Sequence, residues 1–199
     1  MEKNSSDQDG LRERKRRETR RRIAETGLKL FTANGYEATT LDAITEASGI
    51  SRRTFFYYFK SKEEILLAWQ SGLPDAFRAA VLAESADQPP LNATRNALLK
   101  LAVQFKSEQA VSIDRILRSN ELLRASNQAK YLLMEQAAFE ALCERWPQAR
   151  RRKALRIVAM VSVGALRLAI DAWADEEGRK PLIKILNETF ETLQAELLR

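Results

Sequence analysis

The amino-acid sequence predicts an all-α protein, with a small N-terminal domain of three helices and a larger helical C-terminal domain. Two observations lead to this prediction. Apolar residues recur at intervals of three and four along most of the 199 residues, as they do on the buried face of a helix. Residues that end helices follow several of these segments, as at Asn34-Gly35 and at Pro147. We therefore expect helices separated by short turns throughout.

Residues 1–11 are polar and lack periodicity, so the sequence predicts a disordered arm there. A helix is expected from Arg14 to Asn34, with Ile23, Gly27 and Phe31 on one face. Gly35 suits the left-handed position that follows a helix. The first domain is accordingly placed at residues 12–60, and the second at residues 61–199.

The positive charge of the chain is concentrated near its N-terminus. Residues 1–62 contain 14 Lys and Arg against 9 Asp and Glu, whereas residues 63–199 contain 19 against 18. A dense basic run extends from Arg12 to Arg22. Such an excess indicates a polyanionic partner, and a solvated basic tail is the alternative.

Two short helices follow the first one, with a glycine turn between them. Thr39 or Thr40 can cap the first of the pair, Gly49 breaks the chain, and Ser51 can cap the second. Phe55 and Phe59 are one turn apart, which points both into the core. Arg53 and Tyr57 then face outward, and Arg52 lies at the N-terminal end. This pattern is typical of a helix-turn-helix, whose second helix enters the major groove of DNA.

A fourth helix is expected to start at the capping box that begins with Ser61. The sequence suggests that it runs on through Trp69 and joins the two domains in one rigid piece.

The composition argues against an enzyme. Histidine is absent, so no His can act as a general base, complete a catalytic triad or bind a metal. A single cysteine, Cys143, cannot form a zinc site. Neither GxGxxG nor a Walker sequence is present. We expect no catalytic site, cofactor or metal. Catalysis by carboxylates is the remaining alternative, but the acidic residues lie mainly beside Lys or Arg, as on solvated helix faces.

The sequence also favours a cytoplasmic protein without a membrane partner. Its single cysteine fits a reducing compartment. No apolar stretch follows the charged N-terminus. The apolar run Ile157 to Trp173 is short for a membrane span and contains Arg167 and Asp171. We read it as a buried helix.

The stretch from Ala24 to Leu66 resembles the DNA-binding domain of tetracycline-repressor (TetR) family regulators. The matching residues are Leu30-Phe31, Asn34-Gly35-Tyr36, Ala38-Thr39-Thr40, Ile44, Ala47-Ser48-Gly49-Ile50-Ser51, Thr54-Phe55-Phe56-Tyr57-Tyr58-Phe59 and Ser61-Lys62-Glu63. Two positions depart from the family pattern. Phe56 replaces an aromatic hydroxyl, which removes one phosphate contact, and Tyr58 stands where histidine is common.

The resemblance implies which residues contact DNA. It implies that Arg52, Arg53 and Thr54 contact bases, and an arginine can donate hydrogen bonds to both O6 and N7 of guanine. Phosphate contacts are implied for Thr40, Ser51, Tyr57, Tyr58 and Lys62. Tyr36, Phe55 and Phe59 are expected to pack in the core.

The resemblance also implies a homodimer formed by the last two helices, which suits a short reading helix because two copies read a palindromic operator. The first of these helices, around Ala154 to Trp173, is apolar on more than one face. The last one has a stripe at Leu182, Ile185, Leu186, Thr189, Phe190, Leu193 and Leu197. The alternative is that this stripe packs within its own chain.

In the family, the middle helices bind a small effector. Aromatic, methionine and polar residues could line such a site here, and ordinary core packing is the alternative for each of them. The candidates are Phe105, Asn120, Tyr131, Met134, Phe139, Met160, Arg167 and Asp171. Arg167 and Asp171 could instead pair with each other.

The sequence thus predicts a sequence-specific DNA-binding transcriptional regulator. The expected mode of action is repression at a palindromic operator, relieved by a small-molecule effector. A DNA-binding regulator controlled by a partner protein, without an effector, is the alternative.

Overall fold

The computed structural model describes residues 3–103, 107–119 and 121–197, and within these ranges every regular element is a helix. The chain divides into two compact units, Met1–Gln70 and Ser71–Arg199, which we call unit 1 and unit 2. The predicted all-α class is confirmed. The division falls after the fourth helix, whereas the sequence placed it before that helix.

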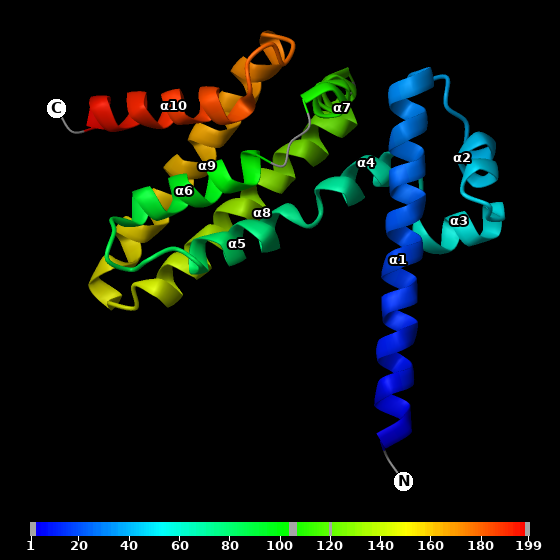
Figure 1. Ribbon diagram of the computed structural model, residues 1–199, viewed down its shortest axis with the longest axis horizontal. Helices are drawn as coiled ribbons and strands as arrows, with labels where there is room; N and C mark the ends of the chain where they lie inside the picture. Colours follow the sequence, from blue (N-terminus) through cyan, green and yellow to red (C-terminus); the bar gives the residue numbers. More distant parts are fainter. Residues whose placement is uncertain (1–2, 104–106, 120, 198–199) are drawn as a thin grey trace. The chain divides into compact units, whose positions relative to one another are not determined.

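Unit 1 consists of α1 (Lys3–Asn34), α2 (Leu41–Ala47), α3 (Arg52–Tyr58) and α4 (Glu63–Gln70). Within this unit, α2 and α3 lie beside the C-terminal half of α1, and the N-terminal part of α1 continues past them (Figure 1). Ile23, Ile44, Phe55 and Ile65 are fully buried and form the centre of its core.

The N-terminal segment differs from the expectation. A disordered arm was predicted for residues 1–11, but α1 already begins at Lys3, and residues 1 and 2 lie outside the described residues. Periodic apolar residues mark only helices that bury an apolar face, and the sequence of residues 3–11 has no such period. Ion pairs one turn apart support α1 just beyond it, between Arg14 and Glu18 at 3.9 Å and between Arg16 and Glu13 at 3.8 Å.

The fourth helix runs through Trp69, as predicted, but it does not continue as one rigid helix into the second domain. α4 begins at Glu63 and ends at Gln70, and Gly72 then caps a separate helix, α5 (Leu73–Leu82). Pro74 explains the break, because it lacks the N–H group that a continuous helix would bond to the carbonyl of Gln70, whereas proline suits the first turn of a new helix.

α4 belongs to unit 1 because it packs tightly on α1. A Cβ atom at Gly27 would lie 2.8 Å from Cδ1 of Ile65, closer than real side chains come. Glycine at this position therefore lets the two helices approach each other.

Unit 2 contains α5, α6 (Pro90–Ala102), α7 (Ser107–Ser119), α8 (Glu121–Arg145), the short 3₁₀ helix η1 (Ala149–Arg151), α9 (Arg152–Asp175) and α10 (Leu182–Leu197). Its central helix is α9, which contacts α6, α7, α8 and α10. The segment Ala149–Asp175 would be long and apolar enough to cross a membrane by length and composition alone. A row of fully or almost fully buried residues, including Leu155, Ala159 and Val163, gives it the pattern of a core helix.

The apolar stripe of α10 packs within its own chain. Leu182, Ile185, Leu186 and Phe190 are all buried, and α10 contacts α6 and α9. For these residues, the alternative of packing inside the monomer is the one observed.

Candidate nucleic-acid interface

Short-range interactions shape the α2–α3 pair. The hydroxyl of Thr40 accepts a hydrogen bond from the backbone N–H of Ala43, and Ser51 does the same for Thr54. The predicted cap at Ser51 is confirmed, and Thr40 rather than Thr39 caps α2. Gly49 has φ +63°, a left-handed conformation that allows the tight turn between the two helices.

α3 has one buried and one exposed face. Phe55 is fully buried and Phe59 almost so, with their ring centres 5.7 Å apart. Arg53 and Tyr57 are exposed, as their spacing predicted, and the side chain of Tyr57 keeps 66% of its surface accessible. Basic and aromatic groups therefore project from a helix narrow enough to enter a DNA groove.

Arg52 links α3 to α2. Its Nε and Nη2 atoms lie 2.5 Å and 2.6 Å from the two carboxylate oxygens of Asp42, a bidentate pair on the surface. Hydrogen bonding from Arg52 lowers the pKa of the Asp42 carboxyl below its ordinary value. This pair orients Arg52 along the surface of the motif.

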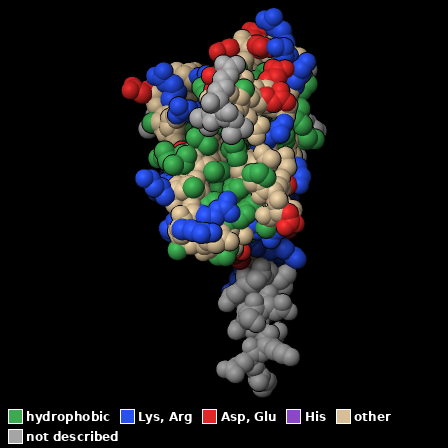
Figure 2. Space-filling model, turned by 90° about the vertical axis from the view of Figure 1, so that its left-hand side faces the viewer, with side chains coloured by type: hydrophobic (Ala, Val, Ile, Leu, Met, Phe, Trp, Pro, Cys, Tyr) green, Lys and Arg blue, Asp and Glu red, His purple; other side chains and the backbone are tan. Residues whose placement is uncertain are grey.

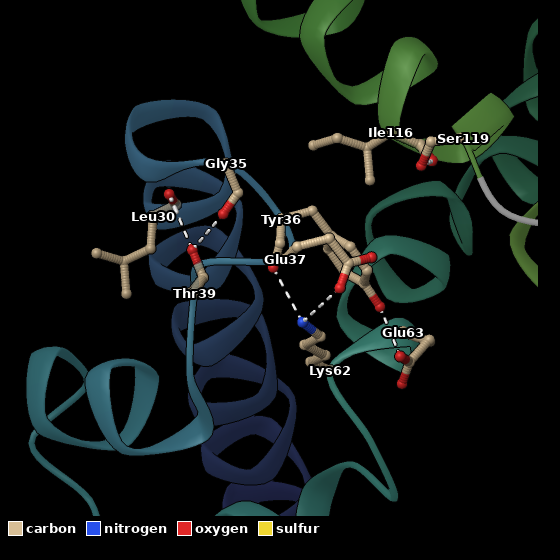
Figure 3. A network of polar contacts seen from close by, with 9 residues as sticks. All are labelled: Leu30, Gly35, Tyr36, Glu37, Thr39, Lys62, Glu63, Ile116 and Ser119. Carbon is tan, nitrogen blue, oxygen red and sulfur yellow. Dashed lines mark hydrogen bonds and ion pairs between the residues drawn. The ribbon is translucent and has the colours of Figure 1, made fainter.

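A network around Tyr36 ties the end of α1 to the start of α4 (Figure 3). The hydroxyl of Tyr36 donates to Oε1 of Glu63 at 2.6 Å, and Nζ of Lys62 donates to the carbonyl oxygen of Tyr36 at 3.0 Å. The same Nζ lies 4.2 Å from the centre of the Tyr36 ring. Tyr36 thus packs beneath the motif, as expected.

The electrostatics of this network follow from its partial burial. Burial raises the pKa of the Glu63 carboxyl, but hydrogen bonds from Ser61 and Tyr36 outweigh it and hold the pKa below the ordinary value. Burial and the contact with Glu63 raise the pKa of the Tyr36 hydroxyl. Glu63 is therefore a carboxylate at neutral pH, held in a defined position.

The residues expected to contact phosphates fall into two groups. Thr40, Ser51 and Tyr57 are exposed around the motif, and Tyr58 is partly exposed. Lys62 differs, because only 21% of its side-chain surface is accessible and its ammonium already has a carbonyl and an aromatic ring as partners. The sequence pattern did not reveal this inward contact.

The effector candidates are not all brought together. Tyr131, Met134 and Phe139 are buried. Met160 keeps 50% of its surface exposed on an outer face of α9, and Arg167 is also exposed, so neither lines an enclosed site within the chain. The spacing of seven residues between Leu132 and Phe139 predicts a shared buried face, but Leu132 is 67% exposed. Phe105 and Asn120 lie outside the described residues.

Unit 2 contains a cluster of charged residues that the sequence analysis missed. Arg118 of α7 bridges two carboxylates, with Nε 2.5 Å from Oδ2 of Asp114 and Nη2 2.7 Å from Oδ1 of Asp171. Asp171 therefore pairs with Arg118, where a pair with Arg167 was considered. Burial raises the pKa of the Asp114 carboxyl above its ordinary value despite the contact with Arg118.

Lys130 of α8 belongs to the same cluster. Its Nζ lies 4.3 Å from the centre of the Tyr131 ring. Burial lowers the pKa of Lys130 to about 8, even though Asp114 and Asp171 act in the opposite direction.

Among the described residues, no group of three or more His, Cys, Asp or Glu side chains is arranged to hold a metal ion. The Asp114–Arg118–Asp171 cluster contains too few ligands of this kind and is neutralised by its own cations.

Comparison with known proteins identifies both parts of the chain. Residues 23–69 match the family described as bacterial regulatory proteins, tetR family, and residues 88–198 match the MftR C-terminal domain. The regulator TcmR of Streptomyces glaucescens is 39% identical over 105 residues, which cover 53% of this chain and 46% of TcmR. The mycofactocin biosynthesis regulator MftR of Mycobacterium tuberculosis is 31% identical over 117 residues, covering 50% of this chain and 59% of MftR.

The chain spans about half the length of these curated relatives. A similar fold is found in the crystal structure of the TetR family repressor FadR from Thermus thermophilus, with a TM-score of 0.60 and 23% sequence identity. That match covers 87% of this chain and 92% of FadR. These relatives are transcriptional regulators and not enzymes. The chain belongs to the TetR family of bacterial transcriptional regulators.

Proposed function

We propose that this protein is a dimeric repressor that binds a palindromic DNA operator in the bacterial cytoplasm and releases it when a small effector binds unit 2. The observation that carries the DNA-binding part is the α2–α3 pair. It presents Arg53 and Tyr57 outward from a helix that is anchored in the core by Phe55.

In this proposal, one set of residues contacts the bases and another contacts the phosphates. Arg53, Arg52 and Thr54 face the bases, and Arg53 is the main reader because Arg52 is held by Asp42. Hydroxyls of Thr40, Ser51, Tyr57 and Tyr58 donate to phosphates, and Lys62 adds a cation.

The experiment that tests DNA recognition is selection of bound duplexes from a random pool. We expect an enriched inverted repeat containing at least one guanine in each half-site. The preferred duplex should also lose on the order of 10³ in affinity between 50 and 200 mM salt, because phosphate contacts release counterions. No enriched sequence, or affinity unaffected by salt, would contradict the proposal.

An exposed apolar stripe on α9 supports the proposed dimer. Ile157, Met160 and Leu168 are 52%, 50% and 60% exposed, and their spacing puts them on one helix face. Gly164 lies on the same face, and a Cβ atom there would meet nothing within 4 Å. Figure 2 shows hydrophobic side chains gathered on one face of the molecule, with Lys and Arg near its border. We assign the α9 stripe, with α10 beside it, to the contact between two copies.

Two features of unit 2 support an effector site. An opening of about 320 Å³ lies between the end of α6, Trp173 of α9 and the first turn of α10. The Nε1–H group of Trp173 is buried and has no hydrogen-bond partner among the described residues. An opening of this size can hold a small ligand, and an unpaired donor can orient a polar group on it. FadR, which has a similar fold, was crystallised with lauroyl-CoA.

The residues that line this opening do not include the buried candidates Tyr131 and Met134, nor Lys130 and Asp171. We propose a small, partly apolar molecule as the ligand. Coupling between two sites is reciprocal, so operator DNA must weaken effector binding by the same factor, typically about 5–150-fold. Calorimetric titration of candidate compounds into free and operator-bound protein tests this. Equal affinity in both states would exclude a compound as the inducer.

A further inference from the structure

Unit 1 contains a groove between the N-terminal part of α1 and the last turn of α3. Its volume is about 560 Å³. The lining residues are Arg12, Glu13, Lys15, Arg16 and Thr19 of α1, and Tyr57 and Tyr58 of α3. We refer to it as the α1–α3 groove. Three of its residues are cations, one is an acid, and two carry phenol hydroxyls.

The α1 side of the groove continues the face of α1 that builds the core of unit 1. At about 100° per residue, Arg12, Arg16 and Thr19 lie within about 40° of the direction of Ile23. Ile23 is fully buried, whereas Arg12 and Arg16 are exposed. The face therefore changes from apolar to basic where α1 extends past α3. The cations of this segment therefore lie on the same side of α1 that, further along the helix, packs against the other helices of unit 1.

Aromatic rings at the C-terminal end of α3 lie beside two of the α1 guanidinium groups. The Arg16 guanidinium lies 5.7 Å from the centre of the Tyr57 ring, and that of Arg20 lies 5.0 Å from the centre of the Phe59 ring. An arginine stacked on a ring keeps its N–H groups available at the edge for other acceptors.

The acid in the groove does not neutralise it. Glu13 lies 3.8 Å from Arg16, and both side chains are more than half exposed. An exposed pair of this kind is weak and yields to a stronger anion. A phosphodiester is such an anion, since guanidinium, ammonium and hydroxyl groups all donate to its oxygens.

We propose that the α1–α3 groove binds a segment of the DNA sugar-phosphate backbone next to the base pairs that α3 reads. The inference rests on the proposed function, because it takes α3 as the helix that enters the major groove. Tyr57 and Tyr58 line the groove and also belong to the helix that reads DNA, so one backbone strand can follow both surfaces. Backbone contacts carry no base identity, so the groove adds affinity and orientation without changing sequence preference.

Two triple variants that remove the same number of positive charges test the groove. The groove variant is Arg12→Ala, Lys15→Ala, Arg16→Ala. The control variant is Arg14→Ala, Arg17→Ala, Arg21→Ala, whose positions point about 120–180° away from Ile23 on the same helix. Each variant removes three positive charges per chain. Circular dichroism should show that both remain folded, because none of the six side chains is buried.

The readout is the dependence of operator affinity on salt, measured on the duplex selected by the wild-type protein. The groove variant should lose about one unit of the slope of log K against log[salt] for each phosphate contact removed, while its base-selection profile stays that of the wild type. The control variant should keep a slope closer to that of the wild type. Ethylation interference identifies the phosphates whose modification prevents binding. Some phosphates whose ethylation blocks binding of the wild type should no longer affect binding of the groove variant, and the control variant should keep the wild-type pattern.

The possible results distinguish failure of the groove from failure of the proposed DNA-binding function. Equal loss of slope in both triple variants would overturn the groove, because net charge alone would then explain the effect. A groove variant with the slope and interference pattern of the wild type would overturn it as well. If the wild-type protein selects no DNA sequence, the proposed function itself fails.

Discussion

The guanidinium of Arg52 donates two hydrogen bonds, of 2.5 Å and 2.6 Å, to the Asp42 carboxylate and so connects the first turns of α3 and α2. Arg53, the next residue, takes part in none of the ion pairs found between described residues. Two adjacent arginines of the reading helix therefore differ in the free protein. One already has a carboxylate partner, and the other can approach a base without giving up a partner.

This difference gives a prediction for base recognition. Arg53→Ala should cost about 1–3 kcal/mol of binding free energy per half-site and relax the preference at one base pair, because an arginine reads O6 and N7 of guanine. Arg52→Ala should change the base-selection profile less, since it mainly breaks the contact with Asp42. Selection of duplexes by each variant measures both effects. A profile unchanged by Arg53→Ala would show that the reading face is placed wrongly.

The network at Tyr36 predicts a pH-dependent contribution to stability. Tyr36→Phe keeps the ring that packs on Phe31 but removes the hydrogen bond to Glu63. Because that bond has a charged acceptor and is partly buried, the variant should lose about 1–2 kcal/mol of the free energy of unfolding at neutral pH. Denaturant titration of the full chain measures the loss.

The sign of the pH dependence follows from Glu63, whose pKa in the folded state lies below its ordinary value of 4.5. Its contribution is present above pH 4.5 and is lost as the pH falls through the folded-state pKa. The difference between the wild type and Tyr36→Phe should therefore shrink in acid. A difference that stays constant down to pH 2 would mean that the hydroxyl stabilises the protein without acting through the Glu63 carboxylate.

Lys130 predicts a second rise of stability with pH, in the alkaline range. Its pKa is about 8 in the folded protein, whereas that of an unfolded lysine is about 10.4. Between these values the unfolded chain binds the extra proton, so stability should rise with pH from about 8 to about 10.4 and stay level below pH 8. Lys130→Met should remove this rise and stabilise the protein at pH 7, by up to about 3 kcal/mol.

The same variant distinguishes a structural from a functional lysine. If Lys130 contacts the effector, Lys130→Met should gain stability yet lose the release of operator DNA by an effector that acts on the wild type. Full release with the variant would leave Lys130 outside the effector site. Lys153→Met, at an exposed position of α9, is the control for removing a lysine charge.

The parts of the fold that were predicted correctly depend on short-range interactions. Ser51 caps α3 through a residue three positions away, and Phe55 and Phe59 are one turn apart on the same helix. Such contacts follow from the spacing along the chain. The break before α5 had a local signal too, at Pro74, and could have been predicted from it.

The features that were missed depend on contacts between distant segments. Asp171 meets Arg118 across 53 positions of sequence, and Lys62 meets Tyr36 across 26. No periodicity within one helix reveals these partners. The stripe of α10 has a related difficulty, because an apolar face looks the same in sequence whether it covers its own chain or a second copy. Only its burial against α6 and α9 distinguishes the two.

The exposed stripe of α9 leads to a prediction about assembly. A glutamate at Met160 or Leu168 would put a charge on the face assigned to the contact between copies, where an unpaired charge is costly to bury. Met160→Glu, Leu168→Glu should therefore be monomeric in sedimentation equilibrium at concentrations where the wild type is a dimer. Its helical circular dichroism should be unchanged, because both side chains are at least half exposed in the single chain.

The dimer variant should also lose most of its operator affinity, because one copy contacts only one half-site. On a duplex with a single half-site, it should bind about as well as a wild-type protomer. Leu133→Glu is the control for an added charge, since it puts a glutamate at a leucine that is 61% exposed on α8, outside the assigned face. That variant should remain a dimer with full operator affinity. If Leu133→Glu dissociates the dimer and the α9 variant does not, the two copies meet through α8, and the stripe on α9 has another role.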